Sequence, residues 1–211
     1  MILKRAFLAG LLCCLALTHP LSAAEKNFRL RYMGSSIISM PTGYLQSQTE
    51  YISDDNHSMV QYSQKIMGLV EGSMLRHLGG EFKDQNILNL KVNLLTEDKL
   101  IPSVVWGVSD VQTKLGSKVF YLAASKNIEM FGVTIHAGAF KDPVTTKKQP
   151  FYGLEKMVLP LVFVVGEHLD GNNSIGMKLR PYPNVDIEIA QRDFGTDHQR
   201  AIYKLRYLIP F

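Results

Sequence analysis

From residue 44 onward, apolar and polar residues alternate in a succession of short segments, with little helical periodicity. In "NILNLKVNLL", leucine and valine residues alternate with Asn89, Lys91 and Asn93. In the final segment, "AIYKLRYLIPF", Lys204 and Arg206 stand between apolar positions. A period of two is typical of a β-strand with one apolar and one polar face.

Turn sequences rich in Gly, Pro, Asn and Asp, such as "LDGNN" and "PYPN", separate these segments. The pattern therefore predicts an all-β chain of antiparallel strands in up-and-down order. The expected strands lie at about 44–53, 58–67, 69–78, 87–95, 102–110, 118–126, 129–139, 151–157, 161–168, 174–180, 185–192 and 201–211.

Two properties of these segments favour a transmembrane β-barrel of 10–12 strands. Longer connections alternate with shorter ones, as in outer-membrane barrels with short turns at one rim. Most segments have about 8–11 residues, which is the length that a tilted strand needs to cross the apolar layer of a bilayer. No repeat and no low-complexity linker interrupts them. We expect a single barrel domain over residues 25–211.

The start of the chain predicts export. Residues 1–24 combine Lys4 and Arg5 with an apolar run and a Ser22-x-Ala24 ending, the layout of a cleaved signal peptide. Cleavage after Ala24 removes Cys13 and Cys14, the only cysteines of the chain, which excludes disulfides and cysteine metal sites. It leaves 21 basic against 19 acidic residues, a balance that does not suggest nucleic-acid binding.

The polar faces of the strands are expected to line the lumen. Charged side chains buried there are tolerated only when they are paired. Pairing around "PYPN" places Lys178 and Arg180 beside Asp186 and Glu188, and the next hairpin places Glu188 near Arg206. The predicted lumen-lining residues are Asn89, Lys91, Asn93, His136, Lys178, Arg180, Asp186, Glu188, Lys204 and Arg206.

The last strand resembles the C-terminal signature of bacterial outer-membrane barrels. Its apolar face consists of Tyr203, Leu205, Tyr207, Ile209 and Phe211. In such proteins this segment is read by the barrel-assembly machinery and closes the barrel against the first strand. The resemblance implies that the assembly machinery is a partner during biogenesis and that outer-membrane lipid surrounds the folded barrel.

Four stretches follow one another in an order that resembles the YjbH-type outer-membrane proteins associated with exopolysaccharide production. They are "MPTGYLQSQTEY", "LKVNLLTEDKLIPSVVWGVSDV", "KVFYLAASKNIEMFGVTIHAGAF" and "PFYGLEKMVLPLVFVVGEHLDGNNSIGMKLRP", which cover about residues 33–192. The shared points are Pro41-Thr42, Glu97, Pro102, Gly107, Asp110, Ser125-Lys126, Gly153-Leu154-Glu155, Glu167 and Asp170-Gly171. Members of that family are usually far longer, with more than one barrel-like region.

The resemblance implies a non-enzymatic accessory barrel or narrow pore, with polysaccharide or export proteins as partners. Two alternatives stay open. A hydrolase acting on lipid or glycan would need Ser125 and His136 within hydrogen-bond reach near the outer rim, and Glu155 with Glu167 could form a carboxylate pair. A soluble periplasmic barrel or sandwich would bury Leu88, Leu90 and Val92 instead. No motif indicates a cofactor or a metal.

Overall fold

The computed structural model describes residues 32–54, 57–80, 82–141, 148–197 and 199–210. The predicted signal peptide, residues 1–24, lies outside the described residues, and so does Phe211. Among the described residues no helix is long and apolar enough to cross a membrane.

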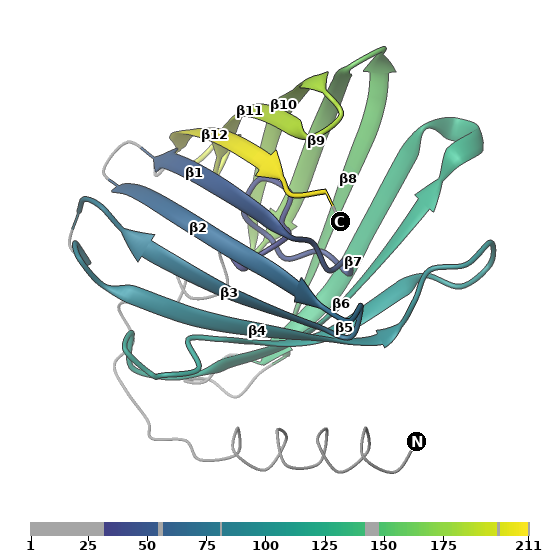
Figure 1. Cartoon of the computed structure of the whole chain (residues 1–211). Coiled ribbons are helices and arrows are strands. Elements are labelled where there is room, and N and C mark those ends of the chain that lie inside the picture. The colour runs from purple at the N-terminus through teal and green to yellow at the C-terminus, as the bar shows by residue number, and fades with distance from the viewer. Residues whose placement is uncertain (1–31, 55–56, 81, 142–147, 198, 211) are drawn as a thin grey trace, which may run out of the picture.

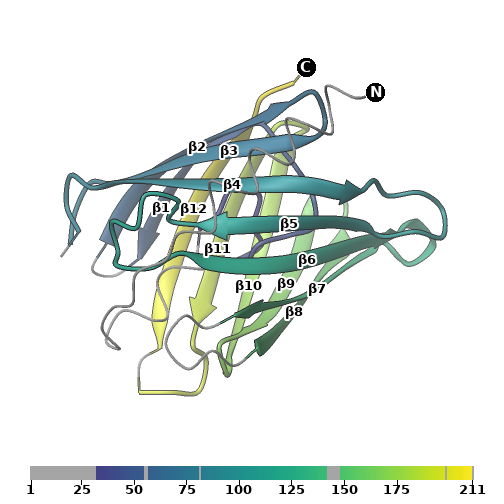
Figure 2. The same cartoon turned by 90° about the horizontal axis from the view of Figure 1, so that it is seen from below.

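Twelve antiparallel strands close into a barrel in up-and-down order (Figures 1 and 2). Each strand pairs with its sequence neighbours, and β12 pairs with β1 to complete the circle. The strands are β1 (Gln48–Asp54), β2 (His57–Ile66), β3 (Val70–His77), β4 (Asn86–Leu95), β5 (Ser103–Ser109), β6 (Val119–Ile128), β7 (Val133–Lys141), β8 (Lys148–Leu159), β9 (Val162–Leu169), β10 (Asn172–Tyr182), β11 (Val185–Arg192) and β12 (Arg200–Leu208). The predicted fold class is confirmed.

Outward and inward positions alternate along the strands as the pleat requires. In β12, Tyr203 and Tyr207 are 52% and 47% exposed, whereas Lys204 and Arg206 are 3% and 6% exposed. Leu88 is exposed on the outer surface of β4, and Val92 on the same strand is buried opposite its cross-strand partner Trp106. Apolar side chains therefore cover the outside of the barrel and ionic side chains lie inside, which contradicts the expectation for a soluble barrel.

The two ends of the barrel differ in their connections. We call the end where β1 begins and β12 ends the β1 rim, and the opposite end the far rim. Long connections gather at the far rim, for example residues 78–85 and 110–118. The predicted alternation is not complete, because only residues 170–171 join β9 to β10 at the far rim, and residues 96–102 form a longer loop at the β1 rim.

The main departure from the sequence prediction is at the start of the barrel. The first strand begins at Gln48 and not at residue 44. Residues 32–47, which we call the plug, run inside the barrel (purple in Figure 1). The plug is a compact loop in which the N–H groups of Tyr32 and Thr42 donate to the carbonyls of Ser39 and Ser35, both at 3.1 Å.

Apolar side chains of the plug pack into two clusters inside the barrel. Ile37 and Met40 belong to a cluster with Tyr121 and Phe151, and Ile38 belongs to a second cluster with Ile52 and others. Room for the first cluster depends on Gly153 in β8, since a Cβ there would lie 2.3 Å from Ile37 Cδ1. The lumen is thus partly apolar, which the expectation of a mixed-charge lining did not include.

Candidate functional site

The plug is held in the lumen largely through its main chain. It lacks the continuous strand partner that would satisfy its peptide groups, and buried peptide groups need hydrogen bonds. Glu71 in β3 accepts hydrogen bonds from the N–H groups of Ser35 and Gln46, at 3.2 and 2.6 Å. Glu167 in β9 accepts from the N–H groups of Ser39 and Met40, both at 2.9 Å. Two wall carboxylates therefore bind four N–H groups of the plug.

Basic side chains of the wall bind carbonyl oxygens of the same segment. Lys91 Nζ donates to Ser35 O at 2.7 Å and lies 3.8 Å from the Glu71 carboxylate. Arg206 Nη2 donates to Ser36 O at 2.7 Å, and Lys204 Nζ lies 3.5 Å from Ile37 O. The wall thus offers acceptors to the N–H groups of the plug and donors to its carbonyl groups.

An ionic network extends from these contacts across the seam between β12 and β1. Arg206 and Glu50 are direct cross-strand partners, and their side chains meet at 2.8 Å. Lys204 lies 3.3 Å from Glu50 and 3.5 Å from Glu188. Because all four side chains are nearly inaccessible to solvent, mutual neutralisation is what makes their burial tolerable.

The structure places most of the predicted lumen residues inside the barrel. The buried ones are Asn89, Lys91, His136, Lys178, Asp186, Glu188, Lys204 and Arg206. Arg180 is partly exposed and forms a bidentate pair with Asp186, with N···O distances of 2.6 and 3.1 Å. Asn93 lies at the β1-rim end of β4, beside a bulge, and is half-buried.

The expected neighbours of two residues change in detail. Lys178 is the cross-strand partner of Glu188, but its ammonium group pairs with Glu155 of β8. Glu188 is opposite Lys204, and Asp186 is opposite Arg206. Glu188 and Arg206 still lie close enough to interact electrostatically, as predicted, although neither is the direct cross-strand partner of the other.

Ser125 and His136 meet inside the barrel as cross-strand partners of β6 and β7. Ser125 Oγ lies 2.6 Å from His136 Nδ1, and His136 Nε2 lies 3.5 Å from Glu155. The N–H of Gly43 in the plug donates to Ser125 Oγ at 2.6 Å. The pair lies nearer the β1 rim than the rim with the long connections, and the plug covers it.

Glu155 and Glu167, suggested above as a carboxylate pair, bind separate partners. Glu155 binds Lys178 and faces His136, whereas Glu167 is occupied by the N–H groups of the plug. Each carboxylate therefore has its own basic or N–H partners. In the described ranges there is no group of three or more His, Cys, Asp or Glu residues that could hold a metal ion.

A cluster of hydrogen bonds around Glu97 at the β1 rim holds the C-terminal end of the plug. Tyr44 Oη donates to Glu97 in the β4–β5 loop at 2.8 Å, and the same carboxylate accepts the N–H of Asn127 and pairs with Lys126 at 3.2 Å. Burial raises the pKa of Tyr44, and the bond to Glu97 raises it further. Burial opposes ionisation of Glu97, but its hydrogen bonds from Asn127 and Tyr44, together with Lys126, lower the pKa of Glu97.

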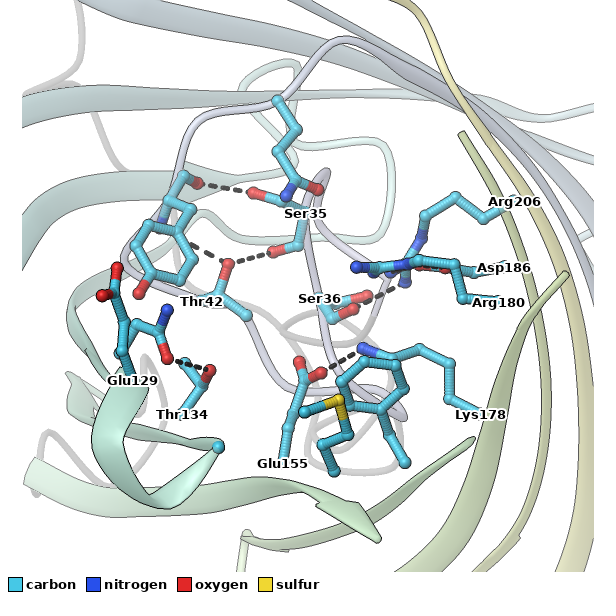
Figure 3. A pocket seen from close by; sticks show the side chains of 16 residues that line it. Ser35, Ser36, Thr42, Glu129, Thr134, Glu155, Lys178, Arg180, Asp186 and Arg206 are labelled. Atoms are coloured by element: carbon cyan, nitrogen blue, oxygen red, sulfur yellow. Dashed lines mark hydrogen bonds and ion pairs between the residues drawn. The ribbon is translucent and has the colours of Figure 1, made fainter. Parts of the chain in front are cut away.

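A polar cavity of about 380 Å³ lies at the β1 rim between the plug and the wall (Figure 3). We call it the rim pocket. Glu129 and Thr134 stand on one side of it, and Lys178, Arg180 and Asp186 on the other, with the plug between them (Figure 3). The complete lining is Ser35, Ser36, Thr42, Tyr44, Gln46, Asn127, Glu129, Gly132, Thr134, Glu155, Met157, Phe163, Lys178, Arg180, Asp186 and Arg206.

Sequence reasoning did not find the plug or the rim pocket. Residues 32–47 show no regular period. The plug is held mainly by hydrogen bonds of its peptide groups to the wall, and such bonds cannot be read from the types of its side chains. One available signal was the cluster of Met33, Ile37, Ile38 and Met40 in a stretch without strand periodicity, which indicated burial without a strand.

No family model matches the sequence, and no curated protein matches it significantly. Among solved structures, the KdgM porin aligns with a TM-score of 0.55 and 9% identity, covering 79% of this chain and 100% of that chain. A structure of the KdgM porin in complex with disordered oligogalacturonate gives the same values. The NanC porin aligns with a TM-score of 0.49 and 9% identity, covering 78% of this chain and 100% of that chain. At this identity the likeness to the KdgM porin concerns the fold, a closed antiparallel barrel.

Proposed function

We propose that the protein is a non-enzymatic β-barrel of the outer membrane that serves export or surface assembly of an exopolysaccharide, with its bore closed by the plug at rest. The observation that carries the proposal is the combination of an apolar exterior with a lumen in which charged wall residues hold an internal segment by its main chain. The polysaccharide part rests on the resemblance to YjbH-type proteins.

The way the plug is held supports a closed state that can open. An intramolecular hydrogen bond to a charged group contributes about 1.5–3 kcal/mol relative to water, because solvent replaces it when it breaks. Contacts such as Glu167 with Ser39 and Met40 can therefore be exchanged for water or for a polyhydroxylated substrate. The KdgM porin structure with disordered oligogalacturonate supports the idea that a barrel of this fold can admit a glycan chain.

Location and biogenesis belong to the same proposal. Tyr203, Leu205 and Tyr207 of β12 face outward, where they can contact lipid, and they belong to the C-terminal signature described above. Just beyond the strand, the N–H of Ile209 donates to Ser47 O at 2.9 Å. Washed-membrane fractionation tests the location, since recovery of the protein in the soluble periplasmic fraction would contradict it.

Planar-bilayer recording tests the closed bore. The wild-type barrel is expected to show few or no conductance steps, and a variant lacking residues 32–43 is expected to show frequent ones. The matched test is the double variant Ile37→Cys with Gly153→Cys, because the side chain of Ile37 points at the position that a Cβ of residue 153 would take, with Cδ1 2.3 Å from it. Oxidation of this pair is expected to abolish openings, and reduction to restore them.

Ile37→Cys alone serves as the control and should not respond to oxidation, because a Cβ added at Gly153 with Ile37 in place would meet Ile37 Cδ1 at 2.3 Å and displace the plug by itself. A plug-deleted barrel that closes normally, as judged by heat-modifiable migration in electrophoresis, and yet conducts no ions would overturn the pore. For the polysaccharide role, cells that carry only the oxidised double variant should display less surface polysaccharide than cells that carry Ile37→Cys alone.

A hydrolase is the second candidate, because Ser125, His136 and Glu155 form a chain of contacts of the kind that activates a serine nucleophile. Its weakness is access, since Gly43 covers a serine that is 1% exposed. A fluorophosphonate probe distinguishes the two roles. We expect no labelling of the plug-deleted barrel, whereas labelling that disappears in Ser125→Ala would establish the hydrolase.

A further inference from the structure

The rim pocket brings together basic and acidic side chains in equal number. Its basic residues are Lys178, Arg180 and Arg206, and its acidic residues are Glu129, Glu155 and Asp186. A pocket of this composition has no excess positive charge with which to attract an anion.

Each basic residue of the pocket is also engaged with a carboxylate. Lys178 forms an ion pair with Glu155. Arg180 forms its bidentate pair with Asp186, and Arg206 lies 2.8 Å from Glu50 and 3.6 Å from Asp186. A uronate or other acidic sugar would have to compete with these carboxylates for the same donors, and it would meet Glu129 at the opposite side of the cavity.

The remaining polar lining consists of uncharged groups. Ser36 and Thr42 contribute hydroxyls from the plug, and Thr134 and Asn127 contribute a hydroxyl and an amide from the wall. Sugar hydroxyls both donate and accept hydrogen bonds, so they can bridge acidic, basic and neutral partners without adding charge. Phe163 and Met157 supply apolar surface, as an amphipathic sugar ring requires.

Two basic side chains of the pocket lie above the ring of Phe163. Lys178 Nζ lies 5.1 Å and the guanidinium carbon of Arg180 lies 5.3 Å from the centre of the ring. Cation–π contacts at this distance are favourable, so the two side chains are held by the aromatic ring as well as by their carboxylate partners. Each of these two donors thus has an aromatic partner in addition to its carboxylate.

We propose that the rim pocket binds an uncharged saccharide unit and discriminates against acidic ones. This inference rests on the proposed function and specifies the substrate class at the β1 rim. The volume of about 380 Å³ lies at the small end of the range for ligand sites, roughly 300–1,000 Å³, which suits one or two sugar rings. Because plug and wall both line the pocket, the bound unit touches the segment that closes the bore.

Calorimetry on the full barrel in detergent, at low ionic strength, tests the preference. The probes are maltotriose, mannotriose and galactotriose as uncharged trisaccharides, and trigalacturonate as the acidic one. At least one uncharged trisaccharide is expected to bind in about the millimolar range, and trigalacturonate about tenfold more weakly or not at all. Equal or tighter binding of trigalacturonate, or binding of none of the four, would overturn the inference.

Two kinds of variant test the physical basis. Replacing Asn127 with Ala and Thr134 with Val should weaken the uncharged trisaccharide about fivefold or more, since lost hydrogen bonds are not replaced. Asp186→Asn should raise affinity for trigalacturonate, because it releases Arg180 and Arg206 from their shared carboxylate. Glu129→Gln tests the same charge effect at an exposed position if the buried change prevents folding.

Asp84→Asn is the matched control, because Asp84 is an exposed carboxylate paired with Arg76 outside the lining of the pocket. It should leave all four affinities unchanged. The outcome is independent of the conductance experiment. A plug-deleted barrel that conducts, combined with a wild-type pocket that prefers trigalacturonate, would retain the proposed function and refute only the charge preference.

Discussion

At the scale of single residues, Glu71 and Glu167 accept main-chain hydrogen bonds of the kind that a neighbouring strand accepts elsewhere in the barrel. Each is at most 5% exposed and accepts main-chain N–H groups of the plug. A carboxylate is suited to this task because it accepts several hydrogen bonds at once and forms stronger ones than a neutral acceptor. The plug can therefore lie in the lumen without regular strand pairing.

Gly43 provides a residue-scale prediction. A Cβ at this position would lie 2.5 Å from Ser125 N and 2.7 Å from Ala124 C, both of which are backbone atoms that cannot move aside. Gly43→Ala should therefore displace the end of the plug and destabilise the closed form by about 1–3 kcal/mol, as overpacking does. The measurement is the frequency of conductance steps, together with the unfolding midpoint in detergent.

Gly72→Ala is the control for that substitution, since a Cβ at Gly72 meets nothing within 4 Å. It should alter neither quantity. If both variants behave alike, the tight approach of Gly43 to β6 does not determine closure.

At the scale of the strand, the seam between β1 and β12 depends on ionic pairing inside and apolar packing outside. Glu50 is fully buried, and it contacts Arg206 at 2.8 Å and Lys204 at 3.3 Å. Removing one partner of a buried pair leaves a charge that is costly to bury. The seam is therefore sensitive to single substitutions on its inner face.

Arg206→Ala is expected to destabilise the barrel by at most about 3–5 kcal/mol, since Glu50 then keeps only Lys204 and Asp186 keeps only Arg180. Urea titration in phospholipid vesicles measures the change, and heat-modifiable migration reports closure. Arg76→Ala is the control, because its pair with Asp84 is solvent-exposed and contributes at most about 1 kcal/mol. A similar small effect in both variants would show that the seam does not depend on the ionic pair.

Strands and plug also differ in how far sequence predicts them. The strands were predictable because side-chain alternation in "NILNLKVNLL" and "AIYKLRYLIPF" reports directly on the two faces of a sheet. Arg180 with Asp186 followed from hairpin register. Lys178 with Glu155 did not, because these residues lie on β10 and β8 with β9 between them. That contact depends on the curvature of the closed wall.

At the scale of the whole molecule, the orientation of the wall decides what surrounds the protein. Ile189 in β11 is 56% exposed on the outer face, between Met177 and Tyr203 on the neighbouring strands, which are 58% and 52% exposed. An apolar patch of this kind around a closed barrel suits the hydrocarbon layer of a bilayer.

Ile189→Arg should therefore destabilise the barrel in vesicles by about 2–4 kcal/mol, the cost of placing a cation near the middle of the lipid-facing band. Urea titration measures the difference. Leu100→Arg is the control, because Leu100 is 93% exposed in the β4–β5 loop and should be indifferent to the charge. Equal tolerance of both substitutions would contradict the lipid-facing orientation.

The position of the plug directly before β1 constrains how the molecule can form. Ser47 leads into Gln48, the first residue of the strand that meets β12, so the segment in the bore is continuous with one side of the joint between the first and last strands. A cylinder sealed early would have to thread this length of chain through its own opening. One that seals last can curl around a segment already seated on Glu71 and Glu167, so insertion and closure become a single event.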